Sequence, residues 1–199
     1  MVKNASRRTF VVALCSAALA CGLAVAPLAF ADTAATGDKA SAAQTGETRE
    51  FTDSLGRTVE IPAEITAIAP SGFLPQQVLL TVAPEKMVVL ASSLTDSQAH
   101  FFGEQYAGLE EVGAIFGAKG DFNREAVAAS GAQIVIDVGD TKKGMAEDLD
   151  ALQEQLGIPC VHISSNLATY GDCYRALGEL LGVEERANEI ADYCDAAYK

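Results

Sequence analysis

Short runs of β-branched and other apolar residues alternate with amphipathic stretches along the chain after residue 50. Each run is four or five residues long, which is typical of a buried strand. The expected strands are 65–69, 87–91, 134–138 and 161–164. In the stretches between them, apolar residues recur three or four positions apart, which predicts helices. The expected helices are 73–82, 94–102, 123–130, 145–156, 170–181 and 184 to the end of the chain.

This alternation of strands and helices predicts the fold class. We expect an α/β fold in which a Rossmann-like parallel sheet is flanked by helices. Ligands of such sheets bind outside the carboxyl ends of the strands. Function is therefore expected in the loops that follow the strands, which are 70–72, 92–95, 113–122, 139–144 and 164–171.

A hairpin is predicted just before the first sheet strand. Residues 51–62 contain two short alternating runs, and Ser54 to Gly56 supply the turn between them. The preceding residues 32–50 are rich in Ala, Thr, Gly and charged residues and show no apolar period. We interpret 32–50 as a flexible linker.

Residues 1–31 have the layout of an export signal. Arg7 and Arg8 precede an almost unbroken apolar run from Phe10 to Phe30, which resembles a twin-arginine signal. Small residues at positions 29 and 31 place the cleavage site before Asp32. The apolar run is also long enough, at about 20 residues, to span a bilayer, so an uncleaved anchor is the alternative. The protein is expected outside the cytoplasm, in the periplasm or at the cell surface.

Cys21 raises a further alternative, a lipoprotein. A Cys that follows Leu19 and Ala20 can accept a lipid after cleavage, although Ala18 stands where such sites usually carry Leu. Lipidation at Cys21 would hold the protein on a membrane surface.

Composition and charge narrow the possible partners. The 199 residues include 14 basic and 27 acidic residues, which gives a net charge of −13, and 49% of them are hydrophobic. Removal of residues 1–31 takes away three basic residues and changes the net charge to −16. The sequence contains no basic patch of the kind that neutralises phosphates, so nucleic-acid binding is not expected.

The sequence gives little support for a bound metal ion. Cys160, Cys173 and Cys194 remain after the signal and form no CxxC pair, so we interpret them as small buried hydrophobes. His100 and His162 have no histidine nearby at ligand spacing, and we interpret each as a partnered core or surface residue.

Motifs of the common α/β enzymes do not occur either. The sequence contains neither GxGxxG nor GxxxxGK[ST], which removes the main support for nucleotide binding, and it contains no GxSxG. We therefore predict no enzyme and no catalytic residue. An exported α/β enzyme stays open as an alternative from a different class.

The segment TDSLGRTVEIP at 52–62, followed by ITAIAP at 65–70, resembles the opening hairpin and first sheet strand of one family. The family is the substrate-binding proteins of ABC importers for iron complexes and cobalamin. Further matching segments are APEKMVVL at 83–90, NREAVAA at 123–129, AQIVI at 132–136, LGIPCV at 156–161 and LGELLG at 177–182. Together the segments cover the chain from about residue 51 to residue 199.

The resemblance implies two α/β lobes that are joined by one long helix and hold a ligand between them. It implies a small-molecule metal chelate as ligand, an iron–siderophore, haem or cobalamin-like complex, and no cofactor. The loaded protein would deliver its ligand to an ABC permease and its ATPase. Glu125, in the Asn-x-Glu segment, would dock on the permease. The alternative for Glu125 is a helix-start acid that stabilises the helix dipole. A receptor for free Zn or Mn ions is the alternative within the binding proteins.

The resemblance also divides the chain. Residues 51–182 correspond to the N-terminal α/β ligand-binding lobe and 183–199 to the start of the interlobe helix, and no C-terminal lobe follows in this sequence. Two positions depart from the family pattern. Gln133 replaces the usual Asp before a strand, and Ala67 stands where Arg is frequent, so the identity of the ligand is not transferred.

Position at the strand ends selects the candidate ligand-binding residues. They are Pro70, Ser71, Gly72, Ser92, Ser93, Asp140, Ser165 and Tyr170. Hydroxyl and aromatic groups at these ends can pack a bulky chelate without ligating its metal. The alternative for each residue is a capping or turn role, because Ser71 and Ser93 precede predicted helices and Asp140 lies in a turn.

Overall fold

The computed structural model describes residues 46–116 and 121–198. The predicted export signal, Cys21 and most of the predicted linker lie outside these residues. Within the described ranges, no helix combines the length and apolar character needed to cross a membrane.

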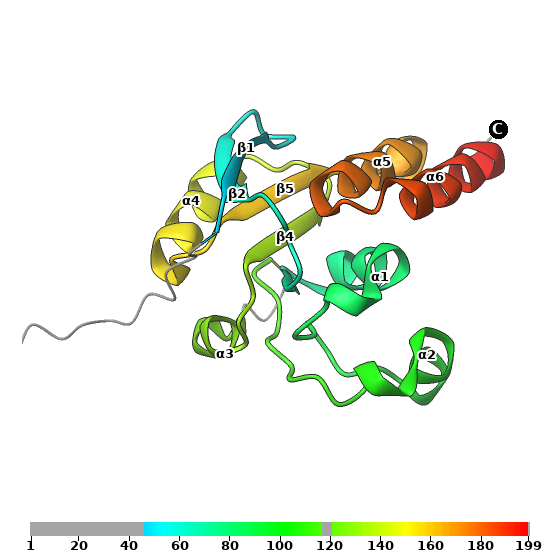
Figure 1. The fold of residues 1–199 in the computed structure, drawn as a ribbon, viewed down its shortest axis with the longest axis horizontal. Coiled ribbons are helices and arrows are strands. Elements are labelled where there is room, and N and C mark those ends of the chain that lie inside the picture. The colour runs from blue at the N-terminus through cyan, green and yellow to red at the C-terminus, as the bar shows by residue number, and fades with distance from the viewer. Residues whose placement is uncertain (1–45, 117–120, 199) are drawn as a thin grey trace, which may run out of the picture. The chain divides into compact units, whose positions relative to one another are not determined.

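Three parallel strands form the central sheet (Figure 1). They are β3 (Ile68–Pro70), β4 (Ile134–Gly139) and β5 (Cys160–Ser164), in the order β3-β4-β5. Pro70 is paired with Ile136 and Gly139 with Ser164, so β4 and β5 project beyond β3 at the carboxyl edge. The predicted α/β fold with a parallel sheet is confirmed.

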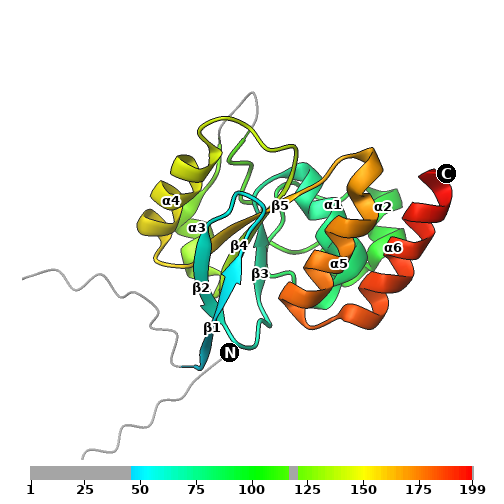
Figure 2. The same cartoon turned by 90° about the horizontal axis from the view of Figure 1, so that it is seen from above.

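Helices cover both faces of this sheet (Figure 2). On one face lie α3 (Arg124–Ala129) and α4 (Met145–Leu156). On the other lie α1 (Phe73–Val82) and α5 (Tyr170–Leu181), and α6 (Glu184–Tyr198) packs against α5. The remaining elements are α2 (Asp96–Phe102) and the 3-10 turns η1 (Pro84–Lys86), η2 (Glu104–Tyr106) and η3 (Leu167–Thr169).

The side chains of β4 explain why the strand carries apolar residues at the consecutive positions 134 to 136. Ile134, Ile136 and Val138 pack into the hydrophobic cluster that contains α1 and α5. Val135 points the other way, into the cluster that contains α3 and α4. Because both faces of a parallel sheet are covered, successive residues are buried in turn on opposite sides.

The predicted helices 73–82, 145–156 and 170–181 are confirmed with these bounds. α2 begins two residues later than predicted, because Thr95 caps it in a reciprocal capping box with Gln98. α3 begins at Arg124, where the Asn123 side chain accepts a hydrogen bond from the Ala126 amide at 3.0 Å.

The predicted strand at 87–91 is wrong in extent. Only two isolated bridges form there, Ile68 with Met87 and Leu90 with Glu111. The Val88 amide donates to the Ile68 carbonyl, but Leu90 exchanges its hydrogen bonds with Glu110 and Val112 instead. The segment therefore pairs with β3 at one position and does not form a fourth strand of the sheet.

The predicted strand 65–69 begins later than expected, at Ile68. The Gln133 side chain is the cause: its Oε1 accepts hydrogen bonds from the amides of Thr66 at 2.7 Å and Ala67 at 3.1 Å. These amides are held by a side chain instead of a strand ladder. Gln133, which departs from the family pattern, thus ties the segment before β3 to the segment before β4.

The predicted hairpin is confirmed, but it begins earlier than residue 51. β1 (Thr48–Thr52) and β2 (Thr58–Pro62) pair antiparallel, with Thr48 opposite Pro62. The predicted boundary of the flexible linker at Glu50 is therefore three residues too late, because 48–50 are already paired. Polar side chains on the exposed side of β1 hide this strand from a search for apolar runs.

α5 and α6 pack closely because α5 carries glycine at the contact. A Cβ on Gly178 would lie 2.6 Å from the Cβ of Ala187, too near for real atoms.

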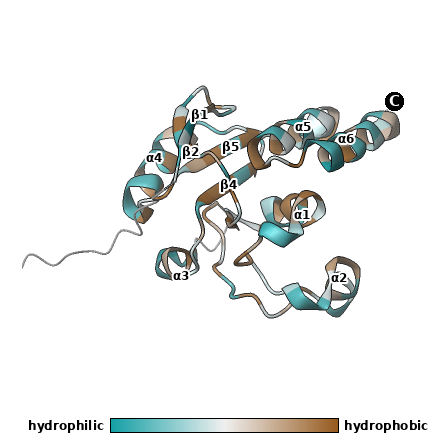
Figure 3. Cartoon of the chain, viewed as in Figure 1, coloured by the Kyte–Doolittle hydropathy of each residue, from teal (hydrophilic) through white to brown (hydrophobic). Residues whose placement is uncertain are grey.

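Apolar residues gather in the strands and in α1, whereas α4 and α6 carry hydrophilic residues (Figure 3).

Candidate functional site

A cavity of about 380 Å³ opens at the carboxyl edge of the sheet, beside the end of β4. It lies between the start of α1 and the loop from β4 to α4. Its lining residues are Ser71, Gly72, Phe73, Leu74, Pro75, Phe116, Asp137, Val138, Gly139, Asp140, Lys142 and Met145. Ligands of open parallel sheets bind at this edge, so the cavity is the candidate binding site.

A buried polar pair forms one wall of the cavity. The Ser71 hydroxyl donates a hydrogen bond to Asp137 Oδ1. Ser71 is 1% exposed and Asp137 is 5% exposed, so only a small part of each residue is accessible. Ser71 follows β3 and Asp137 lies within β4, and their strands are neighbours in the sheet.

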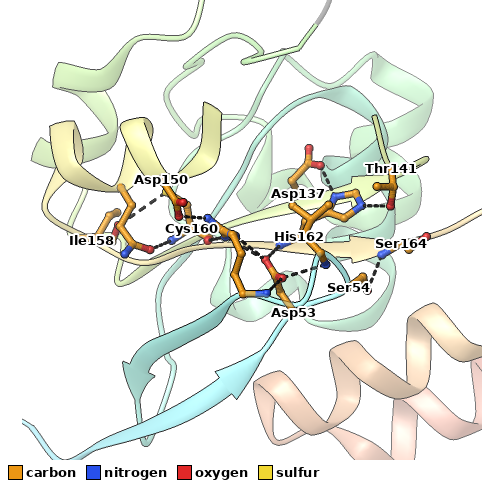
Figure 4. Close-up of polar contacts among 12 residues, drawn as sticks. Asp53, Ser54, Asp137, Thr141, Asp150, Ile158, Cys160, His162 and Ser164 are labelled. Atoms are coloured by element: carbon orange, nitrogen blue, oxygen red, sulfur yellow. Dashed lines mark hydrogen bonds and ion pairs between the residues drawn. The ribbon is translucent and has the colours of Figure 1, made fainter. Parts of the chain in front are cut away.

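His162 contacts the other oxygen of the same carboxylate (Figure 4). Its Nδ1 lies 2.6 Å from Asp137 Oδ2, and its Nε2 lies 3.3 Å from Thr141 Oγ1. The His162 side chain is fully buried. The prediction that His162 is a partnered core or surface residue is confirmed, and the structure places it in the core.

The order of these contacts differs from that of a serine hydrolase. In a catalytic triad the serine hydroxyl is bonded to the histidine, which removes its proton. Here the Ser71 hydroxyl is bonded to Asp137, and His162 contacts the other oxygen of that carboxylate. This arrangement fixes Asp137 in place and does not activate Ser71 as a nucleophile.

Apolar side chains line the mouth of the cavity. Phe73 is 59% exposed and Leu74 is 43% exposed, although both begin a helix whose other apolar residues are mostly buried. Phe116 is half-buried and also lines the cavity. Gly139 has a φ of 150°, a backbone conformation that favours glycine, and a Cβ there would make an ordinary contact with Leu74 Cδ2 at 3.7 Å.

The cavity brings together three of the predicted ligand-binding residues, Ser71, Gly72 and Asp140. The five others are not among its lining residues. Pro70 is buried as the last residue of β3. The backbone of Ser92 is held by Gln76, whose Oε1 accepts from the Ser92 amide at 2.9 Å, and Ser93 is exposed beyond it.

Ser165 directly follows β5 and Tyr170 begins α5, and neither residue lines the cavity. Ser165 is buried, and its amide donates to the Gly139 carbonyl at 2.9 Å. Tyr170 begins α5, where its ring centre lies 6.2 Å from that of Tyr174. Burial raises the pKa of Tyr170, and the nearby thiols of Cys173 and Cys194 raise it further. Neither residue contributes to the cavity in this arrangement.

Sequence reasoning missed Asp137 and the apolar rim. Asp137 is the one charged residue inside the apolar strand Ile134–Gly139, and this exception was a usable signal. Phe73 and Leu74 are predicted only as the first residues of helix 73–82, with no role in binding. Their exposure follows from the position of the helix start beside the cavity.

A second polar network joins the hairpin to the sheet (Figure 4). Asp53 is 5% exposed, and its Oδ1 accepts the amides of Leu55 at 2.9 Å and Arg57 at 3.0 Å. The Arg57 guanidinium pairs with Asp53 Oδ2 at 2.9 Å and with Asp150 at 2.7 Å. These contacts give Asp53 and Arg57, within the segment 52–62, a structural role.

The turn of the hairpin also covers the open edge of β5. The Ser54 amide donates to the His162 carbonyl at 2.9 Å, and the Ser164 amide donates to Ser54 Oγ at 2.9 Å. Arg57 Nη2 donates to the Cys160 carbonyl. These hydrogen bonds protect the edge strand from pairing with another chain.

Cys160 lies in this edge strand. Burial raises the pKa of its thiol to about 12, although the charge of Arg57 opposes this.

Other hollows lie at the opposite end of the fold. Two of them, of about 530 and 660 Å³, are lined by hairpin residues together with Gln133 or with the end of α4. They adjoin the amino ends of β4 and β5, where parallel sheets do not usually bind ligands. We therefore take the smaller cavity as the functional candidate.

Glu125 lies away from the cavity, in the first turn of α3, and is exposed. Within 46–116 and 121–198, no group of three or more His, Cys, Asp or Glu side chains is arranged to hold a metal ion.

No protein-family model and no curated protein matches the sequence. Solved structures do match. One is an ABC transporter solute-binding protein from Sulfurospirillum deleyianum, with a TM-score of 0.64 and 22% identity over 74% of this chain and 46% of that chain. Another is the TroA-like periplasmic binding protein FepB from Veillonella parvula, with a TM-score of 0.54 and 24% identity over 72% of this chain and 45% of that chain.

A third match is the haem-binding protein HmuT, with a TM-score of 0.51 and 20% identity over 76% of this chain and 46% of that chain. At sequence identities of 20 to 24%, this structural similarity establishes the fold alone. The fold is that of one lobe of a solute-binding protein of the TroA-like, class III type. The chain spans less than half the length of the solved structures to which it is similar.

Proposed function

We propose that the chain is the N-terminal lobe of an ABC transporter substrate-binding protein that acts outside the cytoplasm. In this role it captures a metal chelate, an iron–siderophore, haem or cobalamin-like complex, and delivers it to a membrane permease and its ATPase. Two lines of support combine here: the fold of solute-binding proteins, one of them described as haem-binding, and the resemblance of the segments between 51 and 199 to the iron-complex and cobalamin family.

The observation that carries the proposal is the cavity at the carboxyl edge of the sheet. It is mostly apolar, with Phe73, Leu74 and Phe116 at its mouth and one fixed carboxylate in its wall. A bulky chelate is suited to such a surface, because flat apolar contacts bind its body while a few polar groups orient it. The chelate brings its own metal ligands, so this wall needs none from the protein.

Glu125 is the proposed contact with the permease. Its carboxylate is exposed at the start of α3 and points away from the core, where it can accept paired hydrogen bonds from arginine. The Asn123 cap fixes the helix start that presents it.

Thermal unfolding in the presence of candidate ligands tests the proposal. The protein without its export signal, together with any segment that follows residue 199 in its gene, is heated with ferric siderophores, haemin or cobalamin. A ligand present at a hundred times its Kd stabilises the folded state by about 2.7 kcal/mol, which raises Tm by several degrees. Metal-free siderophore, Zn²⁺ and Mn²⁺ serve as controls. Stabilisation by Zn²⁺ or Mn²⁺ alone, or by no chelate of the three classes, would contradict the proposal.

A further inference from the structure

The charges around the cavity are unequal. Asp137 and Asp140 line it with two carboxylates, and Lys142 lines it with one ammonium group. Asp140 and Lys142 are exposed, so water screens both of them. Asp137 is 5% exposed and is screened less, so its carboxylate acts on a molecule at the wall more strongly than the exposed Asp140 and Lys142 do.

Two contacts also fix the orientation of the Asp137 carboxylate. Ser71 Oγ donates to Oδ1, and His162 lies 2.6 Å from Oδ2. Each carboxylate oxygen has a second lone pair and can accept a further hydrogen bond. Neither neighbour needs to move for the carboxylate to accept a donor from a molecule in the cavity.

The Asp137–His162 pair has its carboxylate on the cavity side and its imidazole on the core side. Asp137 lines the cavity, whereas His162 is fully buried and is not among the lining residues. The cavity therefore faces the carboxylate end of the pair whichever protons the imidazole carries. A ligand atom that reaches this wall meets negative charge before it meets the histidine.

We propose that Asp137 is a specificity-determining residue of the cavity, selecting chelates that present a cationic or N–H or O–H donor group and disfavouring polyanionic chelates. This inference rests on the proposed function, because it concerns the ligand of the same site. A polyanion placed against Asp137 meets like charge in a poorly solvated wall, whereas an ammonium group or a hydroxyl satisfies the free lone pairs.

NMR titration with two gallium(III) chelates tests the inference. One is the complex of desferrioxamine B, a trihydroxamate that carries a free ammonium group. The other is the complex of enterobactin, a triply anionic triscatecholate. Gallium(III) replaces iron(III) without broadening the spectra, and shifts of the amides in 71–74 and 139–142 report binding even when it is weak. We expect the cationic complex to bind more tightly by a factor on the order of ten or more.

Asp137→Asn should reduce this preference to near unity, because the amide keeps the shape of the side chain and removes its charge. Asp148→Asn is the matched control: it changes the net charge equally but lies exposed on α4, outside the cavity. Asp140→Asn, on the exposed rim, provides a second variant if Asp137→Asn does not fold, and it should reduce the preference in part.

The outcomes separate the two claims. Equal or tighter binding of the triscatecholate at 71–74 and 139–142, or a preference unchanged in Asp137→Asn and Asp140→Asn, overturns the inference and leaves the proposed function standing. Amide shifts with neither complex, nor with haemin or cobalamin, contradict the proposed function, and the inference falls with it.

Discussion

Arg57 and Asp53 form an ion pair within the turn of the β1–β2 hairpin, with Arg57 Nε 3.1 Å and Nη2 2.9 Å from the same oxygen, Asp53 Oδ2. The Asp53 side chain is fully buried, so its charge depends on this partner and on the amides around it. The same pair anchors the hairpin to β5, because the His162 amide donates to Asp53 Oδ2 at 3.3 Å.

Arg57→Ala is expected to lower the free energy of unfolding by about 3 kcal/mol, because it leaves a buried carboxylate without its counter-ion. Urea denaturation followed by circular dichroism measures the change. Arg124→Ala, at an exposed position of α3, is the control and should change stability by less than about 0.5 kcal/mol. Similar losses for both variants would contradict a structural role for the ion pair.

His162→Ala is expected to destabilise the fold by about 2–4 kcal/mol, because it opens a cavity and leaves Asp137 Oδ2 without its buried partner. The matched substitution His100→Ala lies on an exposed position of α2 and should be nearly neutral. The two variants are compared by urea denaturation. A neutral effect at His162 would mean that Asp137 is not held as described.

Gly178→Ala is expected to cost about 1–3 kcal/mol, because its Cβ would lie 2.6 Å from that of Ala187 and force α5 and α6 apart. Gly108→Ala is the control, since a Cβ there meets no atom within 4 Å. Differential scanning calorimetry measures the Tm of both variants. If Gly178→Ala keeps the native Tm, the two helices are not packed at this distance.

Stability is expected to fall at alkaline pH. Burial raises the pKa of Cys160 to about 12 and the pKa of Cys173 to about 11. In the unfolded chain these thiols ionise near their ordinary pKa, about 8.5. Above that pH the unfolded state binds fewer protons than the folded state, so the free energy of unfolding decreases as pH rises.

Urea denaturation at a series of pH values from 7 to about 10.5 measures this decrease. Cys160→Ala should make the decrease shallower. Cys194→Ala should alter it less, because Cys194 is only partly buried. A free energy of unfolding that does not change across this range would contradict the burial of the thiols.

The sequence was a good guide to helices and to the fold class. Helix 145–156 was predictable because Met145, Leu149 and Leu152 form one buried stripe that ends at Gly157, which adopts the left-handed conformation. The strand at 134–138 was predictable because both of its faces are buried. Both signals depend only on local pattern and burial.

The misplaced strands depended on partners distant in the sequence. The strand expected at 65–69 loses its first residues to the side chain of Gln133, and the one expected at 87–91 turns toward residues 110–112. β1 is polar on its exposed side and owes its place to β2 and to Arg49, which donates to the Leu180 carbonyl at 2.8 Å. No periodicity within one segment reports such contacts.

The candidate site was predictable only in its location. The rule that ligands bind at the carboxyl ends of parallel strands led to Ser71, Gly72 and Asp140. The rule does not say which strand ends share a cavity, and Ser92, Ser165 and Tyr170 lie outside it. Asp137 was missed because a residue inside a strand, not after it, reaches the cavity.

The central claim is that a metal chelate binds at the carboxyl edge of the sheet. The most direct measurement is amide hydrogen exchange of the protein with and without a bound chelate that stabilises it. We predict slower exchange in 71–74 and in 139–142, the segments that line the cavity. Slower exchange confined to the hairpin and to residues 63–66, beside the hollow at the opposite end, would contradict the account.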